Sequence, residues 1–127
     1  MKSLSIILLV LSAAVSAGDS AVPVKIGSVP EMDACLSWGV VSGLQHSALS
    51  VRSGPSAASA KIDSLSNGQG LWLCDASRDG KWLGVVYVRG QDTPECGLSS
   101  PVPAERPYNG PCKSGWVRKT WVKPVAG

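Results

Sequence analysis

The 127-residue sequence has no phenylalanine and a single histidine. His46 follows Gln45 in a polar segment that we expect to be a solvated loop, and a catalytic base would also need a nucleophile and an orienting acid. No two carboxylates have the spacing typical of acid–base catalysis, and no glycine-rich loop could bind a phosphate. We therefore expect neither a catalytic site nor a cofactor.

The sequence also lacks a hydrophobic run long enough to span a membrane. Its most apolar stretch, residues 4–15, follows Lys2 and holds about 12 residues, whereas a helix needs about 20 to cross a bilayer core. A Val-Ser-Ala tripeptide ending at Ala17 then provides the small residues of a signal-peptidase site. We predict a signal peptide over residues 1–17, cleaved before Gly18, and a mature protein that is periplasmic or secreted.

The four cysteines include no Cys-x-x-Cys pair, which argues against a zinc site. Behind an export signal, an even number of cysteines indicates disulfides, and four cysteines allow three connectivities. The segment 93–111 contains five prolines and little that could fill a core, so we expect a bond across its ends to order it. This favours Cys96 with Cys112, which leaves Cys35 with Cys74, although counting alone keeps all three connectivities open.

Acidic residues are absent from the end of the chain. The formal net charge of +3 becomes +2 without Lys2, and no acid follows Glu105. Such a basic stretch fits either a solvated sheet edge or a surface for an anionic partner, and we favour the edge. Nucleic acid is not expected, because no aromatic-basic motif of a known type is present. The basic residues are Arg106, Lys113, Arg118, Lys119 and Lys123.

Helical periodicity is missing as well, because nowhere do apolar residues recur at helical spacing over three turns. Short alternating segments are separated by Gly-Pro, Asn-Gly and Asp-Gly turns, which predicts an all-β domain. An N-terminal arm over 18–33 can hold one added strand. We expect strands at 34–44, 48–52, 61–66, near residue 72 and at 81–88, with a strand pair or short helical turn at 115–122. The predicted core consists of Val51, Ile62, Leu65, Leu71, Leu73, Val85 and Trp116.

Several short motifs occur in a fixed order. They are Leu49-Ser-Val-Arg-Ser-Gly-Pro, the spaced Ile62 and Leu65 before Gly68, Trp82-Leu-Gly-Val, Gly115-Trp-Val and the closing Trp121-Val. From about residue 49 to residue 125 this order resembles the bacterial SH3-like family. The resemblance implies a small SH3-like β-barrel over 34–127 and a binding module instead of an enzyme. The chain departs from the family at 89–114, which we interpret as a proline-rich insertion tied by a disulfide.

Two functions fit this interpretation. The resemblance implies a non-catalytic, secreted binding module for a cell-envelope ligand, either a cell-wall peptide or glycan of peptidoglycan or a protein partner. The alternative is a periplasmic inhibitor or immunity-type protein that blocks an effector enzyme with the insertion. Sedimentation with purified sacculi separates the two, because the binding module pellets and the inhibitor does not.

Five tryptophans and two tyrosines must supply all the aromatic packing. Trp82 and Trp116 occupy motif positions and are expected in the core. We expect Trp72 and Trp121 to expose one face, and Tyr108 has no evident core partner. Exposed indole and phenol rings are common in peptide and sugar contacts, although packing is the stronger interpretation for each ring alone. The predicted contact surface consists of Trp72, Tyr108, Trp121, Arg118 and Lys119.

Overall fold

The structure is a computed structural model that describes Ser3, residues 20–90 and residues 95–127. Apart from Ser3, the predicted signal peptide lies outside the described residues, as does its cleavage point before Gly18. All strand pairs in the described part are antiparallel, and its one helical element is a single 3-10 turn, so the all-β prediction is confirmed. The elements are β1 (Lys25–Ile26), β2 (Ser37–Val41), β3 (Leu49–Arg52), β4 (Lys61–Leu65), β5 (Gly70–Ala76), β6 (Trp82–Tyr87), β7 (Arg106–Pro107), β8 (Lys113–Arg118), η1 (Lys119–Trp121) and β9 (Val122–Ala126).

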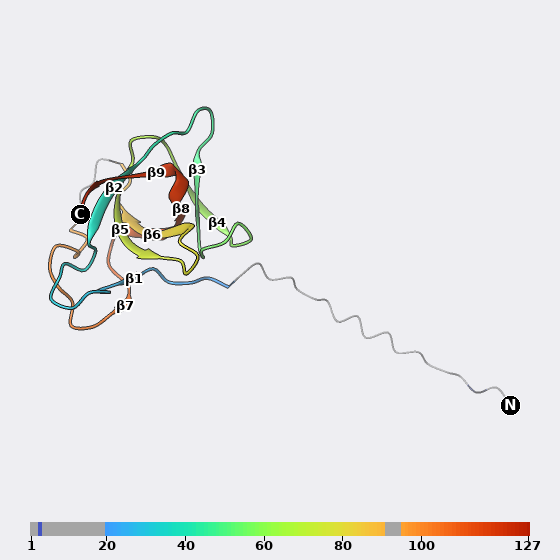
Figure 1. Cartoon of the computed structure of the whole chain (residues 1–127). Coiled ribbons are helices and arrows are strands. Elements are labelled where there is room, and N and C mark those ends of the chain that lie inside the picture. The colour runs from blue at the N-terminus through green and yellow to red at the C-terminus, as the bar shows by residue number, and fades with distance from the viewer. Residues whose placement is uncertain (1–2, 4–19, 91–94) are drawn as a thin grey trace.

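Seven strands form one strongly curved sheet, and the other two form a small second sheet (Figure 1). The order in the large sheet is β4-β3-β8-β6-β5-β2-β9, while β1 pairs with β7. Among the described residues no pairing joins β4 to β9, so the sheet is open and is not the closed barrel that the resemblance implies. β9 contains Pro124, which has no backbone N–H to donate and is therefore suited to a sheet edge.

The hairpin that joins β5 to β6 follows from its turn residues. Gly80 has a φ of 72°, a conformation that glycine adopts without strain. The Asp79 carboxylate accepts hydrogen bonds from the Ser77 hydroxyl at 2.6 Å and from the Lys81 amide at 3.0 Å. This turn fixes the backbone of Lys81, which lines the candidate site described below.

One face of the curved sheet encloses an inner cluster of buried apolar residues. Val51, Leu65, Leu71 and Val85 are at most 1% exposed, and Leu73 packs against the cluster partly buried. These five positions of the predicted core are confirmed. The inner cluster consists of Val41, Leu49, Val51, Leu65, Leu71, Val85, Tyr87, Val117 and Val122.

The prediction that Ile62 lies in the core is wrong. Its side chain is 53% exposed on β4, at one edge of the large sheet. Ile62 and Leu65 are three residues apart, and side chains alternate between the two faces of a strand, so one of the pair must face outward. Leu65 faces inward together with Asp63, whose carboxylate accepts a hydrogen bond from the Tyr87 hydroxyl at 2.7 Å.

A second core lies on the opposite face of the same sheet. In β6, Val85 belongs to the inner cluster and the adjacent Val86 to an outer cluster. Trp82 and Trp116 are buried as predicted, but Trp116 belongs to the outer cluster, because faces alternate and its neighbour Val117 points inward. The outer cluster consists of Val24, Ile26, Ala34, Cys35, Cys74, Trp82, Val86, Cys96, Leu98 and Trp116.

The N-terminal arm and residues 95–112, here called the proline-rich segment, cover the outer cluster. β1 of the arm pairs with β7 of the segment, and the Tyr108 amide donates to the Val24 carbonyl at 2.8 Å (Figure 1). Leu98 is 1% exposed. The expectation that this segment offers little to a core is therefore wrong, because Leu98 is itself a core residue.

Two disulfides tie these layers together. Cys35–Cys74 joins the chain before β2 to β5, and Cys96–Cys112 closes the proline-rich segment, so both favoured pairings are confirmed. Structural disulfides persist in oxidising compartments, which places the domain outside the cytoplasm. In the described part of the chain, no helix has the length and apolar character needed to cross a membrane.

Candidate binding site

Three of the five predicted contact residues lie together where β8 leads into β9. Arg118 ends β8, and Lys119 and Trp121 begin and end η1. Two backbone hydrogen bonds hold the turn, one from the Lys119 amide to the Lys81 carbonyl at 3.0 Å and one from the Ser42 amide to the Trp121 carbonyl at 2.9 Å. The turn is therefore fixed to the β5–β6 hairpin on one side and to the end of β2 on the other.

The guanidinium of Arg118 is stacked on an aromatic ring. Its Cζ lies 4.9 Å from the ring centroid of Trp82, within the range of a cation–π contact. Trp82 is 5% exposed and thus forms a fixed platform. Trp121, which is 37% exposed, lines the same hollow of about 220 Å³. A positioned guanidinium and an open indole face therefore share one hollow.

A second hollow, of about 550 Å³, adjoins the first, because Arg118 lines both. Arg52 lines the first hollow, and Lys81 and Lys119 line the second. Among the described residues, no aspartate or glutamate lines either one. We call the two hollows together the basic groove, defined by Arg52, Lys81, Trp82, Arg118, Lys119 and Trp121.

The carboxylate of Asp79, close to the groove in sequence, is held by its own turn. The hydrogen bond from the Ser77 hydroxyl, with a further one from the Lys81 amide and the charge of Lys81, lowers the pKa of Asp79 below its ordinary value. In the described part of the chain, the ion pairs involve neither Arg118 nor Lys119. Both cations are therefore available to an anionic ligand.

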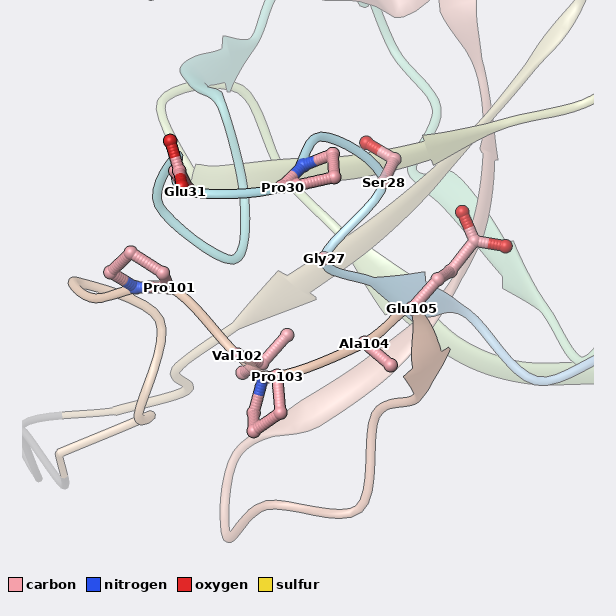
Figure 2. Close-up of a pocket in the computed structure, with 9 residues that line it drawn as sticks. All are labelled: Gly27, Ser28, Pro30, Glu31, Pro101, Val102, Pro103, Ala104 and Glu105. Atoms are coloured by element: carbon pink, nitrogen blue, oxygen red, sulfur yellow. The ribbon is translucent and has the colours of Figure 1, made fainter.

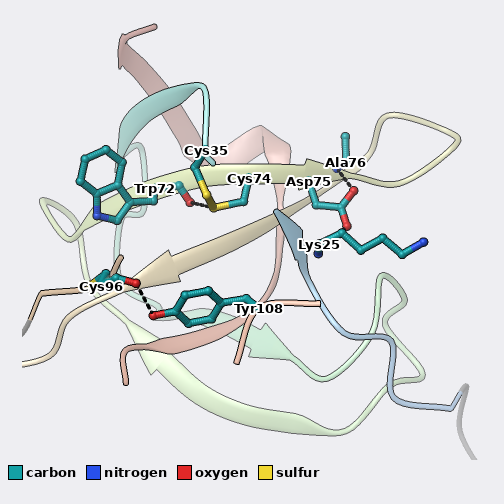
Figure 3. The surroundings of a disulfide bond; sticks show 8 residues. All are labelled: Lys25, Cys35, Trp72, Cys74, Asp75, Ala76, Cys96 and Tyr108. Carbon is teal, nitrogen blue, oxygen red and sulfur yellow. Dashed lines mark hydrogen bonds between the residues drawn. A yellow bond between two sulfur atoms is a disulfide. The ribbon is translucent and has the colours of Figure 1, made fainter. Parts of the chain in front are cut away.

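The structure places Trp72 away from the basic groove, beside the Cys35–Cys74 disulfide (Figure 3). Its half-buried ring packs edge-on against Trp38, with the centroids 4.8 Å apart, and it also contacts the outer cluster. Trp72 is not a wall residue of the groove that holds Trp121.

Tyr108 is also outside the basic groove. Its hydroxyl donates to the Cys96 carbonyl at 3.0 Å (Figure 3) and accepts from the Cys112 amide at 3.1 Å. The ring packs against the outer cluster, so the expectation that Tyr108 has no core partner is wrong. These contacts give Tyr108 a structural role inside the disulfide-closed loop.

Sequence reasoning missed two cations of the groove, Arg52 and Lys81. Arg52 belongs to the Val-Arg motif and Lys81 follows the Asp-Gly turn. A positive charge at the end of a predicted strand could therefore have identified both as candidate binding residues. Their approach to Arg118 depends on pairings that join distant segments, including that of Arg52 with Trp116. Sequence patterns within a single segment do not reveal such pairings.

A further hollow, of about 620 Å³, lies between residues 27–31 and residues 101–105 (Figure 2). Gly27, with a φ of 79°, has no Cβ, and a Cβ there would collide with the side chain of Val102. The hollow has two carboxylates, Glu31 from the first segment and Glu105 from the second, so they lie on opposite walls (Figure 2). We call this the proline-lined hollow; its walls include Pro30, Glu31, Pro101, Pro103 and Glu105.

No protein-family model, no curated protein and no solved structure matches this chain. What the basic groove can do chemically therefore follows from its own residues. Guanidinium and ammonium groups form charge-assisted hydrogen bonds with carboxylates, and an open indole ring packs against apolar or planar groups. The described walls contain no histidine, cysteine or carboxylate, so the arrangement suits the binding of an anionic group beside an apolar one.

Proposed function

We propose that this protein is a non-catalytic binding module of the cell envelope, related to the bacterial SH3-like family, and that its ligand is a peptide bearing carboxylates. The order of motifs from residue 49 to residue 125 supports the family. The two disulfides support a place in the envelope. The basic groove supports the class of ligand.

The observation that carries the proposal is that Arg118 and Trp121 line one hollow of a groove whose described walls hold no acidic residue. The Arg118 guanidinium, held over Trp82, offers two parallel N–H donors to one carboxylate. Lys119 adds a second cation, and Trp121 receives a neighbouring apolar group. A short peptide with a carboxylate next to a small apolar side chain matches this arrangement.

Two sources in the envelope supply such a peptide. One is the stem peptide of peptidoglycan, and the other is an acidic segment of an envelope protein. Both carry carboxylates beside small apolar groups, so both belong to the proposed ligand class. An inhibitor that recognises a folded enzyme does not need either peptide.

The test titrates the mature protein with a synthetic stem peptide and, separately, with a synthetic acidic peptide, following tryptophan fluorescence at low and high salt. A parallel experiment sediments the protein with purified sacculi. We expect at least one peptide to bind, with weaker binding at high salt because screening reduces attraction between exposed charges. Sedimentation with sacculi identifies the stem peptide as the source.

The matched variants are Arg118→Ala with Lys119→Ala, which removes two cations of the groove, and Lys123→Ala, which removes an exposed cation from β9. We expect the double variant to lose most of the binding and Lys123→Ala to retain it. Binding of neither peptide, or equal binding by the two variants, would overturn the proposal. Tight inhibition of an effector enzyme without peptide binding would favour the inhibitor instead.

A further inference from the structure

A third hollow, of about 460 Å³, links the basic groove to the proline-lined hollow. Lys119 lines both this middle hollow and the basic groove, and Ser28 lines both the middle hollow and the proline-lined hollow. The three sites are therefore neighbours with shared wall residues. The apolar walls of the middle hollow are Leu36, Leu73, Leu83 and Pro124.

The charge of the wall residues changes sign along this surface. Arg118 and Lys119 lie at one end, and Glu31 and Glu105 lie at the other. Glu105 faces Lys25 at 4.0 Å, and both side chains are about half exposed. Such a pair contributes little to stability, so a cationic group of a ligand can compete with Lys25 for the Glu105 carboxylate.

The middle hollow has one described carboxylate, that of Asp75, and its oxygens are already bonded. They accept hydrogen bonds from the Lys25 amide at 3.0 Å and from the Ala76 amide at 2.8 Å (Figure 3). Asp75 therefore serves the backbone of β1 and β5. What the middle hollow offers a ligand is mainly its leucine and proline surface.

We propose that the three hollows form one docking surface for an extended segment of a partner protein, acidic at one end and basic at the other. The acidic end lies in the basic groove, an apolar middle lies against Leu36, and the basic end lies beside Glu31 and Glu105. The acidic end rests on the proposed function. The basic end goes beyond it. Of the two ligand sources, the stem peptide and a segment of an envelope protein, it favours the protein segment.

The sizes of the hollows support an extended occupant. The middle and proline-lined hollows, of about 460 and 620 Å³, each fall within the range of a pocket for one small ligand. One compact ligand would fill one of them, whereas an extended chain can engage neighbouring ones in succession. Three prolines restrict the backbone of the far hollow, which reduces the ordering cost of binding. They are Pro30, Pro101 and Pro103.

The test uses four synthetic peptides with the mature protein. Two have an acidic half and a basic half around an apolar centre, in the two chain directions. The third has the same composition with its charges mixed, and the fourth is the acidic half alone. We expect one of the two polarised peptides to bind roughly three- to tenfold more tightly than the mixed peptide, because only it places opposite charges at both ends.

The matched variants separate the two ends of the surface. Glu31→Gln with Glu105→Gln removes both charges of the proline-lined hollow. Glu95→Gln removes an exposed carboxylate of the proline-rich segment, which accepts a hydrogen bond from the Gly97 amide at 3.1 Å. We expect the double variant to abolish the advantage of the polarised peptide and to leave binding of the acidic half unchanged. Glu95→Gln should leave both unchanged.

Equal affinity for the polarised and mixed peptides would overturn this inference while leaving the proposed function intact. Displacement of the polarised peptide by purified sacculi at equal or higher affinity would also overturn it, because the stem peptide would then be the better occupant. Failure of every peptide to bind, the acidic half included, would overturn this inference, and failure of the stem peptide as well would overturn the proposed function.

Discussion

The indole N–H of Trp116 donates a hydrogen bond to the carbonyl oxygen of Val22 at 2.8 Å, across 94 residues of sequence. The Val22 amide donates in turn to the Ser53 carbonyl at 2.9 Å. Trp116 is a buried residue of β8, an interior strand of the large sheet. The N-terminal arm is therefore bonded to the centre of the domain and forms part of its fold.

The contribution of the arm to stability can be measured at Ile26. This side chain is 3% exposed in the outer cluster, so Ile26→Ala should lower the free energy of unfolding by about 2–5 kcal/mol, as measured by urea denaturation. Val22→Ala is the control, because its side chain is 40% exposed and the carbonyl that accepts from Trp116 remains. The control should change stability by less than about 0.5 kcal/mol. Equal stability of the two variants would contradict a packed arm.

A second comparison tests which side of each strand faces the inner cluster. Leu71 is fully buried, so Leu71→Ala should cost about 2–5 kcal/mol. Ile62→Ala removes a comparable apolar side chain from an exposed edge position and should cost less than about 0.5 kcal/mol. Thermal unfolding of both variants under the same conditions provides the measurement. A large loss at Ile62 would show that β4 turns its other face to the core.

Alternation within strands and the turn residues were sufficient to predict the all-β class, most strands and six of the seven core positions, five of them in or against the inner cluster. The second core was missed, although a signal for it was present. Residues 82–88 are apolar without interruption, which is typical of a strand buried on both faces. Leu98 was missed because a proline-rich composition suggests a surface loop, whereas its burial depends on the arm that folds over it.

The five predicted contact residues do not lie at one site in the structure, for a similar reason. Arg118, Lys119 and Trp121 lie within four consecutive residues, so a single turn brings them together. Trp72 and Tyr108 were added because their aromatic rings were expected to be exposed outside the core. The position of a ring relative to a groove depends on sheet order and on long-range pairing, neither of which follows from composition.

The next two predictions concern pH and the contact between Asp63 and Tyr87. Burial acts to raise the pKa of Asp63, but hydrogen bonds from the Tyr87 hydroxyl at 2.7 Å and the Ser64 amide, with the charge of Arg89, lower it overall. A carboxylate whose pKa is lowered by folding stabilises the protein above its unfolded pKa of about 4 and loses that contribution as the pH falls through the folded pKa.

We therefore expect stability to fall on the acidic side below about pH 4, and Asp63→Asn to reduce this dependence. The measurement is the free energy of unfolding from urea titrations across the acidic range. Asp33→Asn, a change at an exposed carboxylate of the arm, is the control. An unchanged acidic slope in Asp63→Asn would show that this contact does not contribute to the acid sensitivity.

The phenol of Tyr87 gives the opposite dependence at high pH. Burial, followed by the hydrogen bond to Asp63, raises the pKa of Tyr87 well above its ordinary value. The protonated phenol therefore stabilises the fold below the unfolded pKa of about 10, and this contribution is lost as the pH rises beyond it. Tyr87→Phe should flatten the alkaline limb of the stability curve, measured by unfolding between neutral and strongly alkaline pH. A limb as steep as that of the wild type would assign the alkaline sensitivity to other groups.

The last prediction concerns Trp121, the open aromatic ring of the basic groove. At 37% exposure the ring contributes modestly to the core, so Trp121→Ala should leave the fold intact. If the indole packs against the apolar part of an acidic peptide, its loss should weaken binding by about 1–2 kcal/mol, or roughly five- to thirtyfold in Kd. Ile62→Ala, which removes another exposed apolar side chain outside the groove, should bind like the wild type. The measurement is a calorimetric titration with the acidic peptide. Unchanged binding by a folded Trp121→Ala variant would show that only the cations of the groove bind the peptide and that the Trp121 ring has a packing role.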